Sequence, residues 1–210
     1  MRSCRALIFD FDGVIVESEH IKSRAFAVLY GEYGDAAAAA AVAYHEANGG
    51  ISRRKKIRYL HKTLLGVELA EETLETLCRR FSMLVQDEVV GCGWVPGARE
   101  VLAEQFGLRP LFVVSGTPQD ELIRIVERRG LARWFAEVHG SPPEKATTIR
   151  AILARRDLDP GTVLFVGDAA ADRRAVREIG VRFIGVLADA KPSRFPAGTP
   201  VISDLTQLVP

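Results

Sequence analysis

Two aspartates, Asp10 and Asp12, follow the apolar run Ala6–Phe9 in the stretch ALIFDFDGVIV near the N-terminus. Residues two apart on an extended chain point to the same side, so their carboxyl groups face a common space. Carboxylates held within a few ångströms repel each other unless a cation neutralises them, and a hard cation such as Mg²⁺ suits oxygen ligands. Aspartate is also common in turns, so an isolated pair of this kind is equally well explained as solvated turn residues.

Three later stretches carry polar groups at the end of a predicted strand or the start of a predicted helix. These groups are Ser115 in LFVVSGTP, Lys145 in GSPPEKATTIRAIL, and Asp168 and Asp172 in TVLFVGDAAADRRAV. In an open α/β sheet, ligands collect outside the carboxyl ends of the strands, so we expect these groups to converge on the N-terminal aspartates. Taken singly, each has an ordinary explanation as a turn residue, a helix cap, a solvated cation or a first-turn acid.

The elements that must position these groups are short apolar runs that end in Gly, Ser or Asp and alternate with helical patterns. We expect strands at residues 6–9, 111–114, 163–166 and 181–186. Near-continuous apolar strands separated by helices predict a parallel sheet that is covered on both faces. The expected fold class is therefore α/β.

Between residues 17 and 90 no convincing strand is present, and apolar residues recur at spacings of three and four. The clearest such pattern comprises Leu74, Leu77, Phe81, Leu84 and Val85. The alanine run at 36–41 is also expected to be helical, with Asp35 as its N-cap, because alanine is the best helix former. This part of the chain is predicted to be an inserted helical subdomain.

Composition and charge exclude several classes of function. A chain of 210 residues that is 48% hydrophobic and 26% charged can bury a sizeable core. Its 28 Lys and Arg balance 27 Asp and Glu, so no global field would gather nucleic acid or an anionic membrane. Three cysteines without a CxxC pair favour a reducing cytoplasm, and no apolar stretch approaches the ~20 residues of a membrane span.

In this order, the motifs resemble those of the haloacid dehalogenase superfamily of phosphotransferases. That superfamily has an N-terminal DxDG after a strand, a strand-end Ser or Thr, a Lys, and a GDxxxD. The resemblance covers almost the whole chain and is greatest to the phosphoglycolate phosphatase and β-phosphoglucomutase branch. It implies a Rossmann-like core at residues 1–16 and 91–210 with a helical cap at 17–90. Ala169 departs from the pattern, because many relatives have Ser there.

The resemblance implies a Mg²⁺-dependent phosphatase in which Asp10 forms an aspartyl-phosphate. Asp12 would protonate the leaving oxygen and then deprotonate the attacking water, so it must be protonated in the first step. Mg²⁺ would be bound by Asp10, Asp168 and the backbone carbonyl of Asp12. A carboxylate nucleophile beside a metal independently suits the transfer of a highly charged phosphoryl group.

The remaining motif residues have implied roles around the phosphoryl group. Ser115 and the backbone N–H groups of Gly116 and Asp12 would donate hydrogen bonds to its oxygens, and Lys145 would neutralise developing charge. Asp172 would lie just outside this shell and orient Lys145 or a metal-bound water.

The cap stretch ANGGISRRKKIRYLHKTLL begins a predicted helix with Arg53, Arg54, Lys55 and Lys56. Cations at a helix N-terminus oppose the helix dipole unless an anion lies nearby. Phosphoglucomutase-like relatives carry a substrate-contacting Arg in the matching loop, which maps onto Arg53. A solvated charged face explains the run equally well. Lys22 is a weaker candidate, and none of the four histidines is assigned a role.

The expected substrate is a small phosphomonoester, such as a sugar phosphate or phosphoglycolate, because a closing helical cap leaves little room for a macromolecule. A β-phosphoglucomutase-like mutase stays open, since it uses the same residues and differs in whether the cap shields the aspartyl-phosphate from water. A non-catalytic phospho-acceptor or binding protein is the alternative of another class, but it needs neither Asp12 nor the long helical insert. The sequence identifies neither the substrate nor the oligomeric state.

Overall fold

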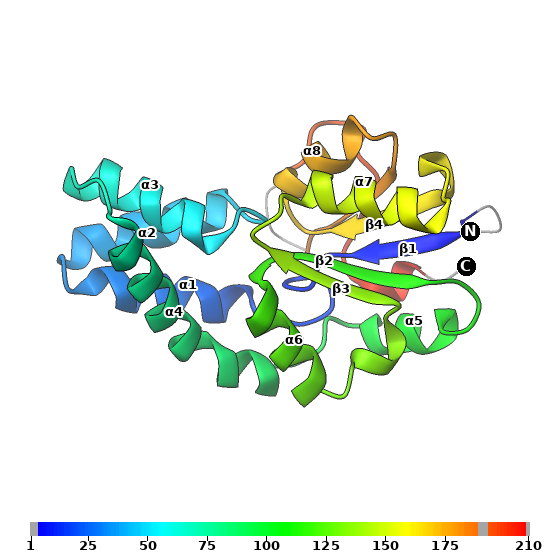
Figure 1. The fold of residues 1–210 in the computed structure, drawn as a ribbon, viewed down its shortest axis with the longest axis horizontal. Coiled ribbons are helices and arrows are strands. Elements are labelled where there is room, and N and C mark those ends of the chain that lie inside the picture. The colour runs from blue at the N-terminus through cyan, green and yellow to red at the C-terminus, as the bar shows by residue number, and fades with distance from the viewer. Residues whose placement is uncertain (1–3, 189–192, 209–210) are drawn as a thin grey trace.

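A computed structural model of the chain describes residues 4–188 and 193–208, and its centre is one parallel sheet (Figure 1). The strands are β1 (Ala6–Phe9), β2 (Leu111–Pro118), β3 (Glu137–Ser141), β4 (Val163–Gly167), β5 (Arg182–Val186) and β6 (Val201–Ile202). They lie in the order β3-β2-β1-β4-β5-β6, so β1 pairs with both β2 and β4. The strand order reverses at β1, and this is where an open α/β sheet forms its ligand crevice.

Helices cover both faces of this sheet, as a buried parallel sheet requires. The helices are α1 (Glu19–Gly31), α2 (Asp35–Ala47), α3 (Arg53–Leu65), α4 (Glu71–Gly91), α5 (Ala98–Gln105), α6 (Gln119–Arg128), α7 (Lys145–Arg156) and α8 (Ala170–Arg177), with 3₁₀ turns at Ala132–Trp134, Pro160–Thr162 and Leu205–Leu208. In Figure 1, α7 and α8 lie on one face, and α5 and α6 lie on the other. Successive residues of β1 accordingly enter two different apolar clusters, Leu7 with α5 and α6, and Ile8 with α7. The predicted α/β fold with a Rossmann-like parallel sheet is confirmed.

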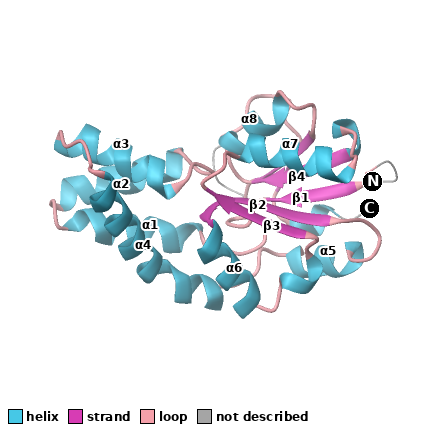
Figure 2. Ribbon diagram, in the orientation of Figure 1, coloured by secondary structure: helices cyan, strands magenta, loops and turns pink. Residues whose placement is uncertain are grey.

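The segment between β1 and α5 contains the four helices α1 to α4 and projects beyond the carboxyl ends of the strands (Figure 2). The residues that α4 buries are Leu74, Leu77, Phe81, Val85 and Val89. They confirm the predicted apolar stripe, in which Leu84 is only partly buried. This stripe continues the apolar cluster of one sheet face, so the helical insert and the sheet share a core. The domain boundaries at 16/17 and 90/91 stay a prediction.

The two chain segments that join the insert to the sheet pair with each other. Val16 and Trp94 form an antiparallel bridge, and the Glu17 N–H donates to the Gly93 carbonyl at 3.0 Å. The two chain connections between the insert and the sheet therefore form one short two-stranded link. Among the described residues, no helix has the length and apolar content needed to cross a membrane.

Some elements differ from the sequence-based expectation, and the reasons are local. Strand β3 has the sequence EVHGS, and β6 has two residues; both are edge strands without the apolar run on which the prediction depended. Strand β2 continues past residue 114 to Pro118, and β5 begins at Arg182 instead of 181. The alanine-rich helix is confirmed, but Asp35 is its first residue and not its N-cap, because Gly34, at φ 99°, precedes it.

Candidate active site

Three buried aspartates meet at the carboxyl edge of the sheet. Asp10 follows β1 and Asp168 follows β4, and these adjacent strands are in register at Phe9 and Val166. Asp172 lies in the first turn of α8 and is fully buried. One carboxylate oxygen from each of the three aspartates lies within 4.8 Å of the other two. The predicted convergence of these residues is therefore present in the fold.

Lys145, the first residue of α7, lies among these carboxylates. Its ammonium nitrogen is 2.7 Å from Asp10 Oδ2 and 2.6 Å from Asp172 Oδ1. The other Asp172 oxygen accepts a hydrogen bond from the Ala169 N–H at 3.2 Å, which fixes the carboxylate. Asp172 thus contacts Lys145 as the sequence analysis expects of a residue that orients it. Arg194 lies 3.7 Å from Asp168 Oδ2, so two cations face three carboxylates and do not neutralise all of them.

That excess charge changes the acidity of the cluster. Burial, together with the charges of Asp172 and Asp12, raises the pKa of Asp10 to about 7 against the opposing charge of Lys145. Burial and the nearby Asp10 carboxylate also raise the pKa of Asp168 well above its ordinary value. Carboxylate oxygens are the ligands that hard divalent cations prefer, and such a cation supplies the missing positive charge. The residues therefore fit a divalent metal ion.

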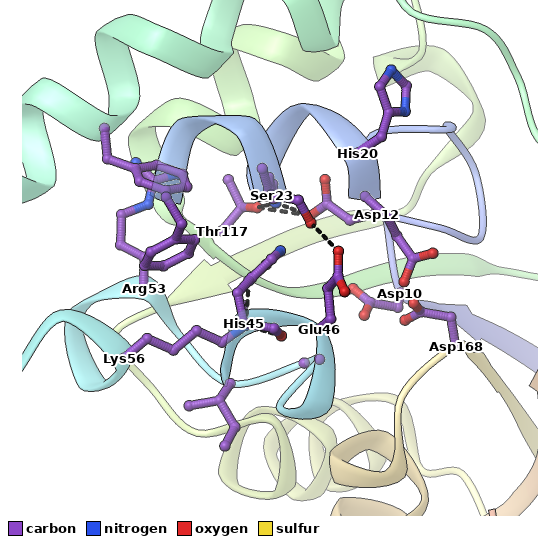
Figure 3. Close-up of a pocket in the computed structure, with 18 of the residues that line it drawn as sticks. Asp10, Asp12, His20, Ser23, His45, Glu46, Arg53, Lys56, Thr117 and Asp168 are labelled. Atoms are coloured by element: carbon purple, nitrogen blue, oxygen red, sulfur yellow. Dashed lines mark hydrogen bonds and ion pairs between the residues drawn. The ribbon is translucent and has the colours of Figure 1, made fainter. Parts of the chain in front are cut away.

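Asp12 belongs to a second network beside this cluster (Figure 3). Its Oδ1 accepts from the Ser18 hydroxyl at 2.5 Å, and its Oδ2 accepts from the Thr117 hydroxyl at 2.9 Å. Lys22 of α1 forms an ion pair with Asp12 and donates to the Thr117 hydroxyl at 2.8 Å. Lys22, the weaker candidate of the sequence analysis, is therefore at the centre of the site.

These contacts hold Asp12 in its ionised form. Burial alone raises the pKa of this carboxyl, but the charge of Lys22 and the hydrogen bonds from Lys22, Ser18 and Thr117 outweigh it and lower the pKa to about 2. The first step implied by the resemblance needs a protonated Asp12. In this arrangement Asp12 can accept a proton but has none to give.

Ser115 and Gly116 lie in the last part of β2, at the same edge of the sheet. The Ser115 hydroxyl is buried; its oxygen accepts from the Thr117 N–H at 3.1 Å and lies 3.4 Å from Asp12 Oδ2. Gly116 lines the cavity beside Asp12. Both residues are thus near the two N-terminal aspartates, as the sequence analysis expects, and their contacts with a phosphoryl group stay a prediction.

Sequence reasoning missed Thr117 and Ser18. Thr117 is two residues after Ser115 on an extended strand, so the same-side rule that groups Asp10 with Asp12 could have found it. Ser18 precedes α1 at the N-cap position, where a serine is normally taken to cap the helix. It makes no side-chain cap hydrogen bond, and its hydroxyl contacts Asp12 instead.

A cavity of about 510 Å³ extends from the acidic cluster into the helical insert, a volume suited to a small molecule. Figure 3 shows Asp10 and Asp168 at one side of it and Arg53 and Lys56 at the other. The loop between α2 and α3 closes over the acidic end. A Cβ added to Gly50 would lie 3.0 Å from Asp172 Oδ1, so this loop is seated directly on the acidic cluster.

Arg53 is buried and already has an anionic partner. Its two terminal nitrogens each lie 2.7 Å from the carboxylate of Glu121 on α6, and its guanidinium carbon lies 4.3 Å from the centre of the Phe81 ring. Glu121 is thus an anion near the N-terminus of α3, and it offsets the unfavourable interaction between Arg53 and the helix dipole. Contact between Arg53 and a substrate stays a prediction. Arg54 and Lys55 pair with surface glutamates, whereas Lys56 is buried.

The family pattern described as haloacid dehalogenase-like hydrolase matches residues 7–186. The chain belongs to this family. A curated relative, the phosphoglycolate phosphatase of Synechococcus elongatus, is 28% identical over 95 residues, which make up 43% of this chain and 44% of that protein. The match therefore spans less than half the length of this relative. The resemblance to the superfamily is confirmed.

Two solved structures share the fold of this family member. The β-phosphoglucomutase of Clostridium difficile has a TM-score of 0.77 and 18% identity, with 98% of this chain and 93% of that chain covered. CbbY of Rhodobacter sphaeroides in complex with xylulose-1,5-bisphosphate has a TM-score of 0.74 and 17% identity, with 98% and 96% covered. At these identities the likeness concerns the fold alone.

Proposed function

We propose that this chain is a Mg²⁺-dependent phosphatase that hydrolyses a small phosphomonoester through an aspartyl-phosphate on Asp10. The observation that carries the proposal is the acidic cluster with Lys145 at the closed end of a cavity for a small molecule. A carboxylate nucleophile, a metal-binding set of oxygens and a fixed ammonium are the groups that phosphoryl transfer needs. Membership of a hydrolase family, the phosphoglycolate phosphatase relative and the bisphosphate bound to CbbY give independent support.

In this proposal the chain positions the phosphoryl group between β1 and β2. Asp10 attacks the phosphorus, Lys145 offsets the charge on the phosphoryl oxygens, and Ser115 and the Gly116 N–H donate hydrogen bonds to them. Mg²⁺ would be held by Asp10, Asp168 and the backbone carbonyl of Asp12, and when bound it draws negative charge from the phosphoryl oxygens.

Asp12 acts as the acid for the leaving oxygen and then as the base for water. The ion pair with Lys22 sets a condition on this role, because a carboxylate paired in this way cannot carry the proton. Lys22 must therefore leave Asp12 when the substrate enters, and the phosphate oxygens offer it another anionic partner.

A phosphosugar mutase is the second candidate. The observation that favours it is the seating of the Gly50 loop on Asp172, because a cap closed so tightly limits the access of water to an aspartyl-phosphate. A mutase would convert one sugar phosphate into its isomer with little release of inorganic phosphate. Phosphorus NMR of the reaction mixture separates the two outcomes.

The test compares Asp10→Asn with the wild type in phosphate release from p-nitrophenyl phosphate. We expect Asp10→Asn to abolish turnover, because an amide is not a phosphoryl acceptor, and chelation to abolish turnover by the wild type. Asp87→Asn is the matched control, since Asp87 is on the surface, pairs with Arg128 and is not among the residues that line the cavity. Wild-type turnover by Asp10→Asn would rule out the covalent mechanism, and undiminished turnover after exhaustive chelation would rule out the metal.

A further inference from the structure

Lys56, on α3, is a buried lysine in the wall of the cavity. Its side chain is almost inaccessible, with 2% of the residue exposed. The ammonium nitrogen lies 2.8 Å from His45 Nδ1 and 3.3 Å from the His45 carbonyl, and 6.0 Å from the centre of the Phe26 ring. Among the residues that the structure describes, no carboxylate pairs with Lys56.

The other described cations that line the cavity each have a carboxylate partner. Lys22 pairs with Asp12, Arg53 pairs with Glu121, and Arg194 lies 3.2 Å from Glu19 and 3.7 Å from Asp168. Within the described part of the cavity wall, Lys56 is thus the cation whose charge is unmatched.

A buried ammonium without an anion is costly, because it has lost its hydration and gained no opposite charge in return. His45 does not supply that charge. Burial and the charges of Lys56 and Lys22 lower the pKa of His45 to about 3, so the ring is neutral and its Nδ1 accepts from Lys56. His45 therefore orients the ammonium and leaves its charge free for a group that enters the cavity.

We propose that Lys56, oriented by His45, binds an anionic group at the end of the substrate away from the transferred phosphoryl group. The inference rests on the proposed function, and it narrows the substrate class to phosphomonoesters whose far end carries a carboxylate or a second phosphate.

The shape of the cavity fits a molecule of this kind. Lys56 and the cluster of Asp10 and Asp168 are at opposite sides of the cavity in Figure 3, and the side chains of Phe26 and Phe81 contribute apolar surface to its wall. The volume of about 510 Å³ leaves room for several carbon atoms between the two anions.

The carboxylates Glu19 and Glu46 also line the cavity, and each has a partner within the chain. Glu19 pairs with Arg194, and Glu46 accepts a hydrogen bond from the Ser23 hydroxyl at 3.0 Å. In Figure 3, Glu46 lies between Lys56 and Asp10, and the dashed line from its carboxylate leads to Ser23. Neither of these two carboxylates forms an ion pair with Lys56.

The first experiment compares matched substrates that differ at the far end. Glycerol 3-phosphate is paired with 3-phosphoglycerate, glucose 6-phosphate with 6-phosphogluconate, and a pentulose 5-phosphate with its 1,5-bisphosphate. We expect the wild-type kcat/KM to be about ten- to hundredfold higher for the anionic member, the range that a contact with a charged group gives. Comparison of the two carboxylic acid pairs with the bisphosphate pair shows whether a carboxylate or a second phosphate is preferred. Equal kcat/KM within every pair would overturn the proposal.

The second experiment measures the same ratio in variants. We expect Lys56→Met to remove most of the preference for the anionic member, and Lys56→Arg, which keeps the charge, to restore part of it. Lys55→Met is the matched control, because Lys55 is exposed, is adjacent in the chain and pairs with Glu144. A Lys56→Met ratio equal to that of the wild type would overturn the proposal. If Lys56→Met does not fold, Lys56→Gln tests the same point with a neutral hydrogen-bond donor.

A binding measurement separates this inference from the proposed function. Calorimetry with the Asp10→Asn protein measures the affinity for the same ligand pairs without turnover. Tighter binding of the anionic members that depends on Lys56, together with no phosphate release from any ligand or from p-nitrophenyl phosphate by the wild type, would support the anion site and refute the phosphatase. If the wild type turns over p-nitrophenyl phosphate but shows no preference for the anionic ligands in binding or in kcat/KM, the phosphatase proposal stands and the anion site is refuted.

Discussion

Lys22 and Lys56 both line the cavity, but they differ in whether a carboxylate balances their charge. Lys22 pairs with a carboxylate, whereas the described polar contacts of Lys56 are with the neutral ring of His45 and with a backbone carbonyl. Burial, and then the like charge of Lys22, lowers the pKa of Lys56 from its ordinary 10.5 to about 7, although Asp168, Asp12 and Glu19 oppose the shift. Of these two lysines, Lys22 is thus paired with a carboxylate and Lys56 is not.

The first prediction concerns the free energy of unfolding of Lys56→Met without metal or substrate. Between pH 7 and 10.5 the unfolded chain binds more protons at Lys56 than the folded chain does, so the wild type gains stability as pH rises through this window. We expect Lys56→Met to be more stable than the wild type below pH 7 and to lose that advantage by about 1 kcal/mol per pH unit above it.

Urea unfolding at a series of pH values measures this difference. Lys55→Met is the control, since Lys55 is exposed and its pair with Glu144 lies on the surface. A difference between Lys56→Met and the wild type that does not change with pH would show that the buried ammonium carries no unfavourable charge.

At the scale of elements, the loop between α2 and α3 determines how closely the cap approaches the acidic cluster. Gly50 has φ +74°, and a Cβ there would lie 3.0 Å from Asp172 Oδ1 and 3.1 Å from the Ala169 Cβ. Ala169, where many relatives carry Ser, is therefore in contact with the cap as well as adjacent to Asp168. Its small side chain leaves room for the loop.

The second prediction separates backbone strain from contact at this loop. Gly50→Ala and Gly66→Ala both place a side chain at positive φ, but a Cβ at Gly66 meets nothing within 4 Å. We expect both to lower the free energy of unfolding by about 1 to 2 kcal/mol. Only Gly50→Ala should also lower kcat/KM, by about ten- to hundredfold, because it displaces the loop from Asp172. Equal kinetic effects of the two variants would contradict this account.

The strands that the sequence predicts most directly are those that the sheet buries on both faces. β1, β2 and β4 read as apolar runs, and their ends located Asp10, Ser115 and Asp168. β3 and β6 are edge strands whose burial is incomplete, so hydrophobic pattern does not reveal them. The role of Lys22 could not be read in the same way, because its ion pair with Asp12 depends on how the first cap helix packs against the sheet.

At the scale of the whole molecule, Arg53 and Glu121 connect the cap to the core. Arg53 begins α3 and Glu121 belongs to α6, and their side chains are 5% and 1% exposed. Ser82 of α4 also donates to the Glu121 carboxylate at 2.6 Å. The pair is thus a buried ionic contact that holds the two parts of the chain together in the closed arrangement.

The third prediction is a double-mutant cycle on this contact. Arg53→Met and Glu121→Gln should each lower the free energy of unfolding by about 3 to 5 kcal/mol, because each leaves an uncompensated buried charge or loses its partner. The double variant should lose much less than the sum, since no unpaired charge remains. Urea unfolding measures all three, and additive losses would show that Arg53 and Glu121 do not act on each other.

The two-stranded link between cap and core connects the Asp12 carboxylate to the first cap helix. Its first strand is the segment that leads from Asp12 to Val16, and Asp12 and Val16 also pair with each other. Ser18 and Lys22, which contact the Asp12 carboxylate, lie just beyond this segment at the start of the first cap helix. The segment that joins the cap to the sheet therefore leads directly to two of the groups that contact the Asp12 carboxylate. Because the contacts with Lys22 and Ser18 lower the pKa of Asp12, the protonation state of this carboxyl depends on the position of the start of the first cap helix.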